Sequence, residues 1–179
     1  MKLLISIFIC LLGFYQSAVT QLSNEFVSGK IESKIKNMGF NVTGTMNIVA
    51  IQFKQPSNDP ATWDIEGSAD PATISTGIEL RDKHLKKSDY FNVPKYPAIH
   101  LQSAGIKSKG KNKYEGTFKL TIKETTKSLV IPLTINKDGK IINMEGEFEI
   151  NRLDYGLGEE STILSDNVKV KVSAVFKIL

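Results

Sequence analysis

The most informative segment for the fold reads TGIELRDKHLKKSDYFNVPKYPAIHLQS, residues 76–103. Its first half departs from the alternating rhythm of nearly all the rest of the chain. Ile78 and Leu85 are seven residues apart with charged residues around them, so the spacing predicts a short helix with one apolar side, ending by Tyr90. Pro94 and Pro97 prevent its continuation, and a period of two returns after them. A helix is therefore inserted between strands.

The chain on both sides of this stretch has the pattern of β-strands. Apolar and polar residues alternate most clearly over Tyr114–Ile122, Met144–Ile150 and Val168–Ile178. Each run has one apolar face and one charged face, which is typical of a strand that covers a core. Cross-strand pairs between glutamates and lysines on the charged faces keep such a surface solvated. Pro132 lies within another run and cannot donate to a ladder, so it predicts a bulge or an open edge.

The number and spacing of these runs limit the possible fold classes. Roughly eight strands in one domain, joined mostly by connections of hairpin length, predict antiparallel β structure. The pattern alone does not separate a sandwich from a closed barrel. In an eight-stranded barrel the interior is just wide enough to be filled by side chains or to hold one slender ligand. Whether side chains or a ligand fill the interior therefore decides between a packed protein and a binding protein.

Several ordered motifs carry a family resemblance. They read RDKHL at 81–85, DYFNV at 89–93, YPAI at 96–99 and RLDYG at 152–156. Together they closely resemble the signature of the YceI-like polyisoprenoid-binding proteins. The resemblance implies a mainly β fold, namely a single extended antiparallel eight-stranded lipocalin-like β-barrel with the short helix near one end. It also implies a polyisoprenoid ligand.

The first residues have the features of a secretory leader. Met1-Lys2 is positive, Leu3–Phe14 is apolar and Ser17-Ala18 is small, so we expect a signal peptide over residues 1–18. The barrel domain then occupies residues 19–179, in the periplasm or outside the cell. A membrane anchor is the alternative, but the apolar run is short for a span and no stop-transfer pattern follows.

Composition argues against several functions. The formal charge is +4, and the basic residues are dispersed among acidic ones, so nucleic-acid binding has no support. The only cysteine is Cys10, inside the expected leader. The mature chain would therefore have no thiol for a disulfide, a metal site or a nucleophile.

Few residues could carry catalysis. His84 and His100 are the only histidines and lack the spacing of a metal motif. Asp82 and His84, two residues apart, point to opposite sides of a helix turn, so no dyad is indicated. Arg81 and Asp82 are expected to form a structural ion pair or a cap. We therefore expect no enzyme, no metal and no cofactor.

Two hypotheses about function remain. The first is a secreted or periplasmic binding protein that sequesters or carries a polyisoprenoid or similar long apolar lipid chain, the class implied by the resemblance. The second is a solidly packed barrel that acts as a stress-related or protein-interaction module through its outer surface. Gly116 and Gly146 favour the first, because they interrupt bulky inner rows and leave space beside Phe118 and Phe148.

Under the first hypothesis the lipid tail lies against the inward-facing rows. The expected lining residues are Trp63, Ile65, Tyr114, Phe118, Leu120, Phe148, Ile150, Val170 and Val172. A polar head group would lie at the barrel mouth and pair with Arg81 or His84. A transient membrane or membrane-protein partner would deliver or receive the lipid. The length and head group of the lipid and the oligomeric state stay open.

Overall fold

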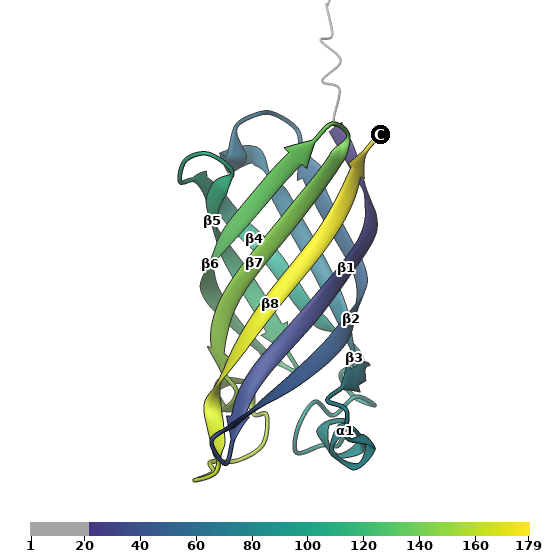
Figure 1. The fold of residues 1–179 in the computed structure, drawn as a ribbon, viewed down its shortest axis with the longest axis vertical. Coiled ribbons are helices and arrows are strands. Elements are labelled where there is room, and N and C mark those ends of the chain that lie inside the picture. The colour runs from purple at the N-terminus through teal and green to yellow at the C-terminus, as the bar shows by residue number, and fades with distance from the viewer. Residues whose placement is uncertain (1–21) are drawn as a thin grey trace, which may run out of the picture.

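The computed structural model describes residues 22–179, which form a closed antiparallel barrel (Figure 1). Its strands are β1 (Leu22–Asn37), β2 (Phe40–Gln55), β3 (Asp64–Ser75), β4 (Ile99–Ser108), β5 (Lys113–Ile122), β6 (Thr125–Asp138), β7 (Ile141–Asn151) and β8 (Leu164–Ile178). Each strand pairs with the next and β8 pairs with β1. The connections contain α1 (Glu79–Leu85) and two 3-10 turns, η1 (Pro60–Thr62) and η2 (Leu153–Tyr155). The predicted eight-stranded barrel is confirmed, and the expected leader lies outside the described residues.

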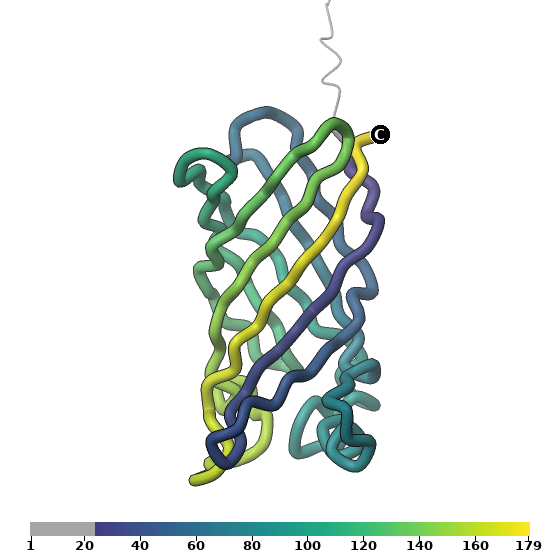
Figure 2. Tube along the Cα trace, in the orientation of Figure 1, coloured from purple at the N-terminus to yellow at the C-terminus, as the bar shows by residue number. Residues whose placement is uncertain are grey.

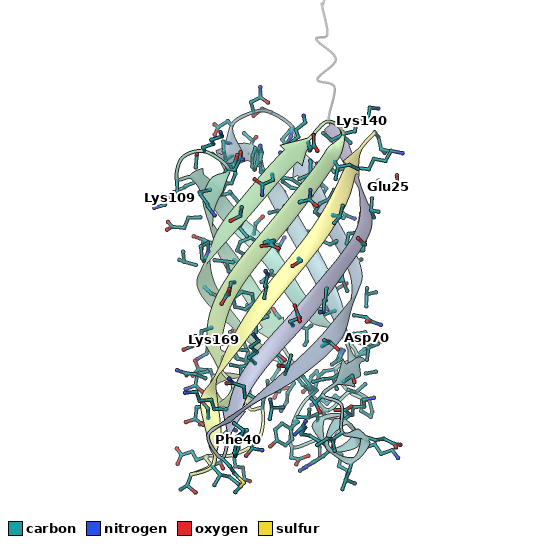
Figure 3. The ribbon with its side chains drawn as sticks, in the orientation of Figure 1. Glu25, Phe40, Asp70, Lys109, Lys140 and Lys169 are labelled. Carbon is teal, nitrogen blue, oxygen red and sulfur yellow. The ribbon has the colours of Figure 1, made fainter. Side chains whose placement is uncertain are left out.

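The faces of the strands follow the predicted alternation. On β7, Ile142 and Ile150 are buried, whereas the glutamates between them are exposed. On the adjacent β8, Lys171 is opposite Glu147, and its Nζ lies 3.3 Å from Oε2 of Glu145. Figure 3 shows charged side chains covering the outside of the barrel. Exposed pairs of this kind keep the surface solvated and contribute little to stability.

β6 and β7 are paired along only part of their length. Their ladder begins at Leu133 and Gly146 and runs to the turn between them, while the rest of β6 pairs with β5 and the rest of β7 with β8. Pro132 lies next to the end of this ladder, in agreement with the predicted open edge. Near this gap η2 is joined to β6, since Nζ of Lys127 lies 2.9 Å from Oδ1 of Asp154.

The inserted helix α1 lies at one end of the barrel, between β3 and β4 in the sequence (Figure 1). It is shorter than predicted and ends at Leu85 rather than near Tyr90. The chain continues in turns, and the N–H of Phe91 donates to the carbonyl of Leu85 at 3.0 Å. The helix stops because residues 86–89 are two lysines, a serine and an aspartate, which offer no apolar side chain to extend its inner side. No helix within residues 22–179 is long and apolar enough to cross a membrane.

The interior is divided into a packed half and a half that holds a cavity. The packed half lies away from α1, toward the end where the chain terminates (Figure 1). Its buried core consists of Phe53, Trp63, Ile65, Ile106, Phe118, Ile131, Leu133, Ile135, Ile142, Met144, Ala174, Phe176 and Ile178. A smaller cluster borders the other half and consists of Leu120, Ile122, Ile150, Tyr155 and Leu157.

This division predicts unequal costs for the same truncation. Ile106 is 1% exposed within the packed half, whereas Ile31 is partly buried and borders the cavity. Ile106→Ala should lower the free energy of unfolding by about 2–5 kcal/mol. Ile31→Ala should cost distinctly less, because its side chain already faces space. Urea unfolding followed by circular dichroism measures both, and equal losses would contradict the division.

Candidate functional site

An apolar cavity of about 370 Å³ occupies the half of the barrel next to α1. Its walls come from β1, β2, β3, β4, β5, β7 and β8, and its open end is bordered by α1 and the turns that follow it. The apolar wall residues are Ile31, Ile35, Val42, Met46, Ile48, Ile51, Ala69, Ile74, Leu85, Tyr90, Phe91, Ile99, Leu101, Leu120, Ile122, Phe148, Ile150, Leu157, Leu164, Val168, Val170 and Val172. A cavity with this lining suits an apolar ligand.

The cavity exists because the side chains along its walls are short. On β1, β2 and β8 the inward residues near α1 are mostly valine and isoleucine, which do not reach across the barrel. Ile31, Ile48 and Val170 are accordingly only partly buried although they point inward. Inward apolar side chains of a packed core are normally fully buried. Their exposure marks unfilled interior.

Aromatic rings close the other end of the cavity. The ring centroid of Phe53 lies 5.6 Å from that of Trp63 and 5.6 Å from that of Phe176. The Trp63 ring lies 5.0 Å from Tyr114, and Phe26 packs edge-on against Phe176 at 6.0 Å. These spacings are typical of favourable aromatic contacts. The cavity therefore has one open end.

The expected lining residues divide between the two halves. Leu120, Phe148, Ile150, Val170 and Val172 line the cavity. Trp63, Ile65 and Phe118 belong to the packed core instead, and Tyr114 packs against it. All nine expected lining residues are therefore interior residues, but four of them lie in the packed half, beyond the closed end of the cavity.

The expected lining residues fall into two groups because they lie at different positions along the barrel axis. Figure 2 shows the strands running obliquely from one end of the barrel to the other. One inward row of β5 therefore begins in the packed half with Gly116 and Phe118 and reaches the cavity with Leu120 and Ile122. Alternation reports which way a residue points and not how far along the barrel it lies.

The glycines that were expected to make space do not do so. A Cβ added to Gly116 would collide with the ring of Phe118, and one added to Gly146 would lie 3.0 Å from Cδ2 of Leu133. Neighbouring side chains already fill both positions. The glycines that border the cavity are Gly44 and Gly67, and a Cβ on Gly67 would meet nothing closer than 3.8 Å.

The residues predicted at the mouth do border the cavity. Arg81 and Asp82 do not pair with each other and instead both contact Thr76. Oδ1 of Asp82 accepts from the backbone N–H of Thr76 at 2.8 Å, and Arg81 donates through Nε to the Thr76 hydroxyl at 2.7 Å and through Nη2 to its carbonyl at 2.9 Å. A guanidinium has five N–H donors. Arg81, which lines the cavity, therefore retains donors for a ligand.

His84 also borders the cavity and is held by two neighbours. Its Nε2 lies 2.6 Å from Oδ2 of Asp89, and its ring meets Tyr90 edge-on at 5.2 Å. The hydrogen bond from His84 lowers the pKa of Asp89 below its ordinary value, against a smaller opposing effect of desolvation. A polar ligand group at the mouth would thus meet both Arg81 and His84.

Arg152 also lines the cavity. In the sequence it was noted only as part of the family motif at 152–156, and no role was predicted for it. It is 3% exposed, and each nitrogen of its guanidinium has a partner. Nε donates to the carbonyl of Ser165 at 3.0 Å, Nη1 to that of Leu157 at 2.9 Å, and Nη2 to Oδ1 of Asp166 at 2.8 Å. Arg152 therefore fixes the connection between β7 and β8 across this end of the barrel.

The two histidines occupy different surfaces. His100 is exposed on β4, where it pairs in register with Ser68 and Thr121. Within residues 22–179 no three His, Cys, Asp or Glu side chains gather closely enough to hold a metal ion.

A closed eight-stranded barrel with a helix at the open end of an apolar cavity is a lipocalin-like barrel. The YceI-like domain matches residues 20–176, and the chain belongs to that family. The UPF0312 protein of Azotobacter vinelandii is 25% identical over 150 residues, which cover 80% of this chain and 78% of that protein. The UPF0312 protein plu2095 of Photorhabdus laumondii is 31% identical over 108 residues, covering 60% and 56%.

Two solved structures illustrate the likeness in fold. BcnA of Burkholderia cenocepacia has a TM-score of 0.74 at 25% identity, covering 82% of this chain and 95% of that one. A domain from Saccharophagus degradans, described as polyisoprenoid-binding and implicated in plant cell wall breakdown, has a TM-score of 0.68, covering 88% and 99%. Its identity is 12%, so this likeness concerns the fold alone. The resemblance read from the motifs is confirmed.

The contact between His84 and Asp89 predicts a measurable titration shift. His84→Ala should raise the pKa of Asp89 toward its ordinary value, because the variant removes the hydrogen bond that favours the carboxylate. Since the pKa is lowered in the folded protein, the contribution of this contact is complete above the ordinary carboxyl pKa and is lost as the pH falls through the lowered value.

Carboxyl carbon NMR titration measures this pKa directly. Lys87→Gln is the matched control, since Lys87 is only the weakest of the influences that lower the pKa of Asp89. Identical titration of Asp89 in the wild type and His84→Ala would contradict the assignment.

Proposed function

We propose that the protein binds a single long apolar lipid chain in its cavity and so sequesters or carries it. The observation that supports this function is the cavity itself, which is apolar, closed at one end and bordered by polar groups at the other. Its volume of about 370 Å³ is near the lower end of the range for small-molecule sites. A slender ligand suits it better than a bulky one.

Burial of apolar surface drives the binding. Each buried CH₂ group contributes about 0.8 kcal/mol, so a five-carbon isoprene unit gains about 4 kcal/mol before the costs of ordering are deducted. Burial of the cavity walls adds to the favourable free energy of binding, because Ile31, Ile48 and Val170 exchange contact with water for contact with the ligand. A few isoprene units inside the cavity suffice for stable binding.

The ligand class we propose is a polyisoprenoid. It rests on the YceI-like family and on the apolar lining, and the name of the Saccharophagus degradans domain agrees with it. The aromatic closure admits no passage through the barrel, so the tail enters first and the head stays outside. The head group then lies near Arg81 and His84, where a charged or hydroxylated group finds hydrogen-bond donors.

Binding rather than catalysis is the function that these residues support. Arg81, His84 and Arg152 at the cavity border are held by hydrogen bonds, and they do not form a nucleophile and base aimed at one point. The alternative of a solidly packed barrel describes only the half away from α1. The cavity therefore favours the ligand-binding hypothesis.

We also propose that the protein is exported, on the basis of the predicted leader over residues 1–18. The mature chain should begin between Ala18 and Gln21 and act in the periplasm or outside the cell. Intact-mass measurement of protein recovered from the non-cytoplasmic fraction tests this. Retention of Met1 or a diacylglyceryl adduct would contradict it.

Gly67 offers a direct test of the cavity as the binding site. It pairs with Ile51 and Leu101 and borders the cavity, its φ is not positive, and the nearest atoms to a Cβ there would lie 3.8 Å away. Gly67→Leu should therefore place its side chain in the cavity without a clash and block the ligand. Gly67→Ala, the matched control, should fold equally well and leave most of the space free.

The measurement combines two readouts. Solvent extraction and mass spectrometry identify any lipid that co-purifies, and thermal unfolding is compared with and without added polyprenol. A ligand that binds only the folded state raises the melting temperature by mass action. We expect a rise for wild type and Gly67→Ala and none for Gly67→Leu. An equal rise in melting temperature for all three proteins would contradict the cavity as the binding site. No rise in wild type, together with no co-purified lipid, would contradict the proposed function.

A further inference from the structure

Large apolar side chains are exposed around the open end of the cavity. We call five of them the apolar rim: Met38, Phe40, Ile78, Leu80 and Ile163. Phe40 is 78% exposed and Leu80 81% exposed, which are the highest values among the large apolar residues of the described chain. Exposed apolar clusters of this kind mark sites of interaction with proteins or membranes.

The rim residues come from three segments at one end of the barrel. Met38 and Phe40 lie at the turn between β1 and β2, and Leu80 lies on α1. Ile163 belongs to the connection between η2 and β8, and its carbonyl accepts from the N–H of Met38 at 2.7 Å. Figure 1 shows α1 and the β1–β2 turn at the same end of the barrel, and Figure 3 places Phe40 there.

The rim continues the lining of the cavity. Val42, Gly44 and Met46 form the inward row of β2 and border the cavity, and Phe40, the first residue of β2, belongs to the same row at the end of the barrel. Leu164, which follows Ile163, also borders the cavity. Apolar side chains of β2 thus extend from the cavity lining to the exposed rim at this end of the barrel.

The charges of α1 balance, with two acidic and two basic residues, and two lysines follow the helix directly. Nζ of Lys83 lies 2.7 Å from Oε1 of Glu79, and Asp89 is paired with His84. Lys86 and Lys87 directly follow the helix, and neither has an acidic partner within residues 22–179. The acidic residues 159 and 160 lie on the connection to β8, which approaches the chain after α1, since the N–H of Gly158 donates to the carbonyl of Asp89 at 2.7 Å.

We propose that the apolar rim docks the open end of the barrel on a lipid bilayer, with Lys86 and Lys87 meeting anionic head groups. This inference rests on the proposed function, because it requires a ligand that resides in membranes. Rim side chains inserted into the acyl boundary would join the membrane interior to the cavity, so that the lipid passes between them without crossing water. A bilayer supplies the ligand at this end, whereas a protein seated there would cover the opening.

Flotation with vesicles of phosphatidylethanolamine and phosphatidylglycerol tests the docking. Wild type should float with them. Phe40→Ser/Leu80→Ser should weaken the partition about tenfold or more, because two large apolar side chains leave the interface. Val49→Ser/Val130→Ser is the matched control, since both valines are exposed on the barrel wall, at 62% and 57%, and it should float like wild type.

A second variant tests the lysines. Lys86→Gln/Lys87→Gln should weaken the partition about fivefold for each lysine on vesicles with phosphatidylglycerol, and should have little effect on pure phosphatidylcholine. The thermal shift with added polyprenol is measured in parallel, and all these variants should retain it, because none of the substituted residues lines the cavity.

The outcomes separate docking from ligand binding. Absence of flotation by wild type that retains its polyprenol shift would overturn the docking and leave the proposed function standing. Flotation without any polyprenol shift would support the docking and sink the proposed function. Equal flotation of the rim variant and wild type would also overturn the docking. A rim variant that floats normally but loses self-association in light scattering would assign the rim to contact between copies.

Discussion

The aromatic cluster of Phe53, Trp63 and Phe176 determines how the interior of the barrel is divided. An eight-stranded barrel has an interior of nearly fixed width, so the size of its inward side chains decides whether it is solid or hollow. The Phe53 ring lies 5.6 Å from both the Trp63 ring and the Phe176 ring, and these three rings help to fill the interior at one end. Isoleucine and valine at the other end do not, and the cavity begins where the rings stop.

The alternation in the sequence predicted antiparallel β structure and the direction of the side chains, and the family resemblance added the closed barrel. A period of two fixes which face of a strand is apolar, because a shift of one residue would expose the whole row. The position of a residue along the barrel axis is a separate property from the direction of its side chain. Phe118 and Leu120 lie in one row of β5, yet the first is packed and the second lines the cavity. Their depth depends on strand tilt and on register with other strands, which are long-range properties.

The same reasoning explains which site residues were missed. Arg81 and His84 were found because their motif is local, and the structure does place both beside the cavity. Arg152 has the sequence signal of an ordinary surface cation at the end of a strand. It is buried because Leu157, Ser165 and Asp166 supply its acceptors, and only the folded chain brings them together. An unpaired arginine could not have stayed at that depth.

A hollow half costs stability, since its walls lack the contacts of a packed interior. The packed half, the long ladder between β1 and β8 and the Arg152 hydrogen bonds offset that cost. The lining can therefore vary in shape without loss of the fold. Because the aromatic cluster closes one end, a ligand must enter and leave by the other. The β1–β2 turn, α1 and the connection to β8 border that end, so the ligand proposed for the cavity would pass their surfaces.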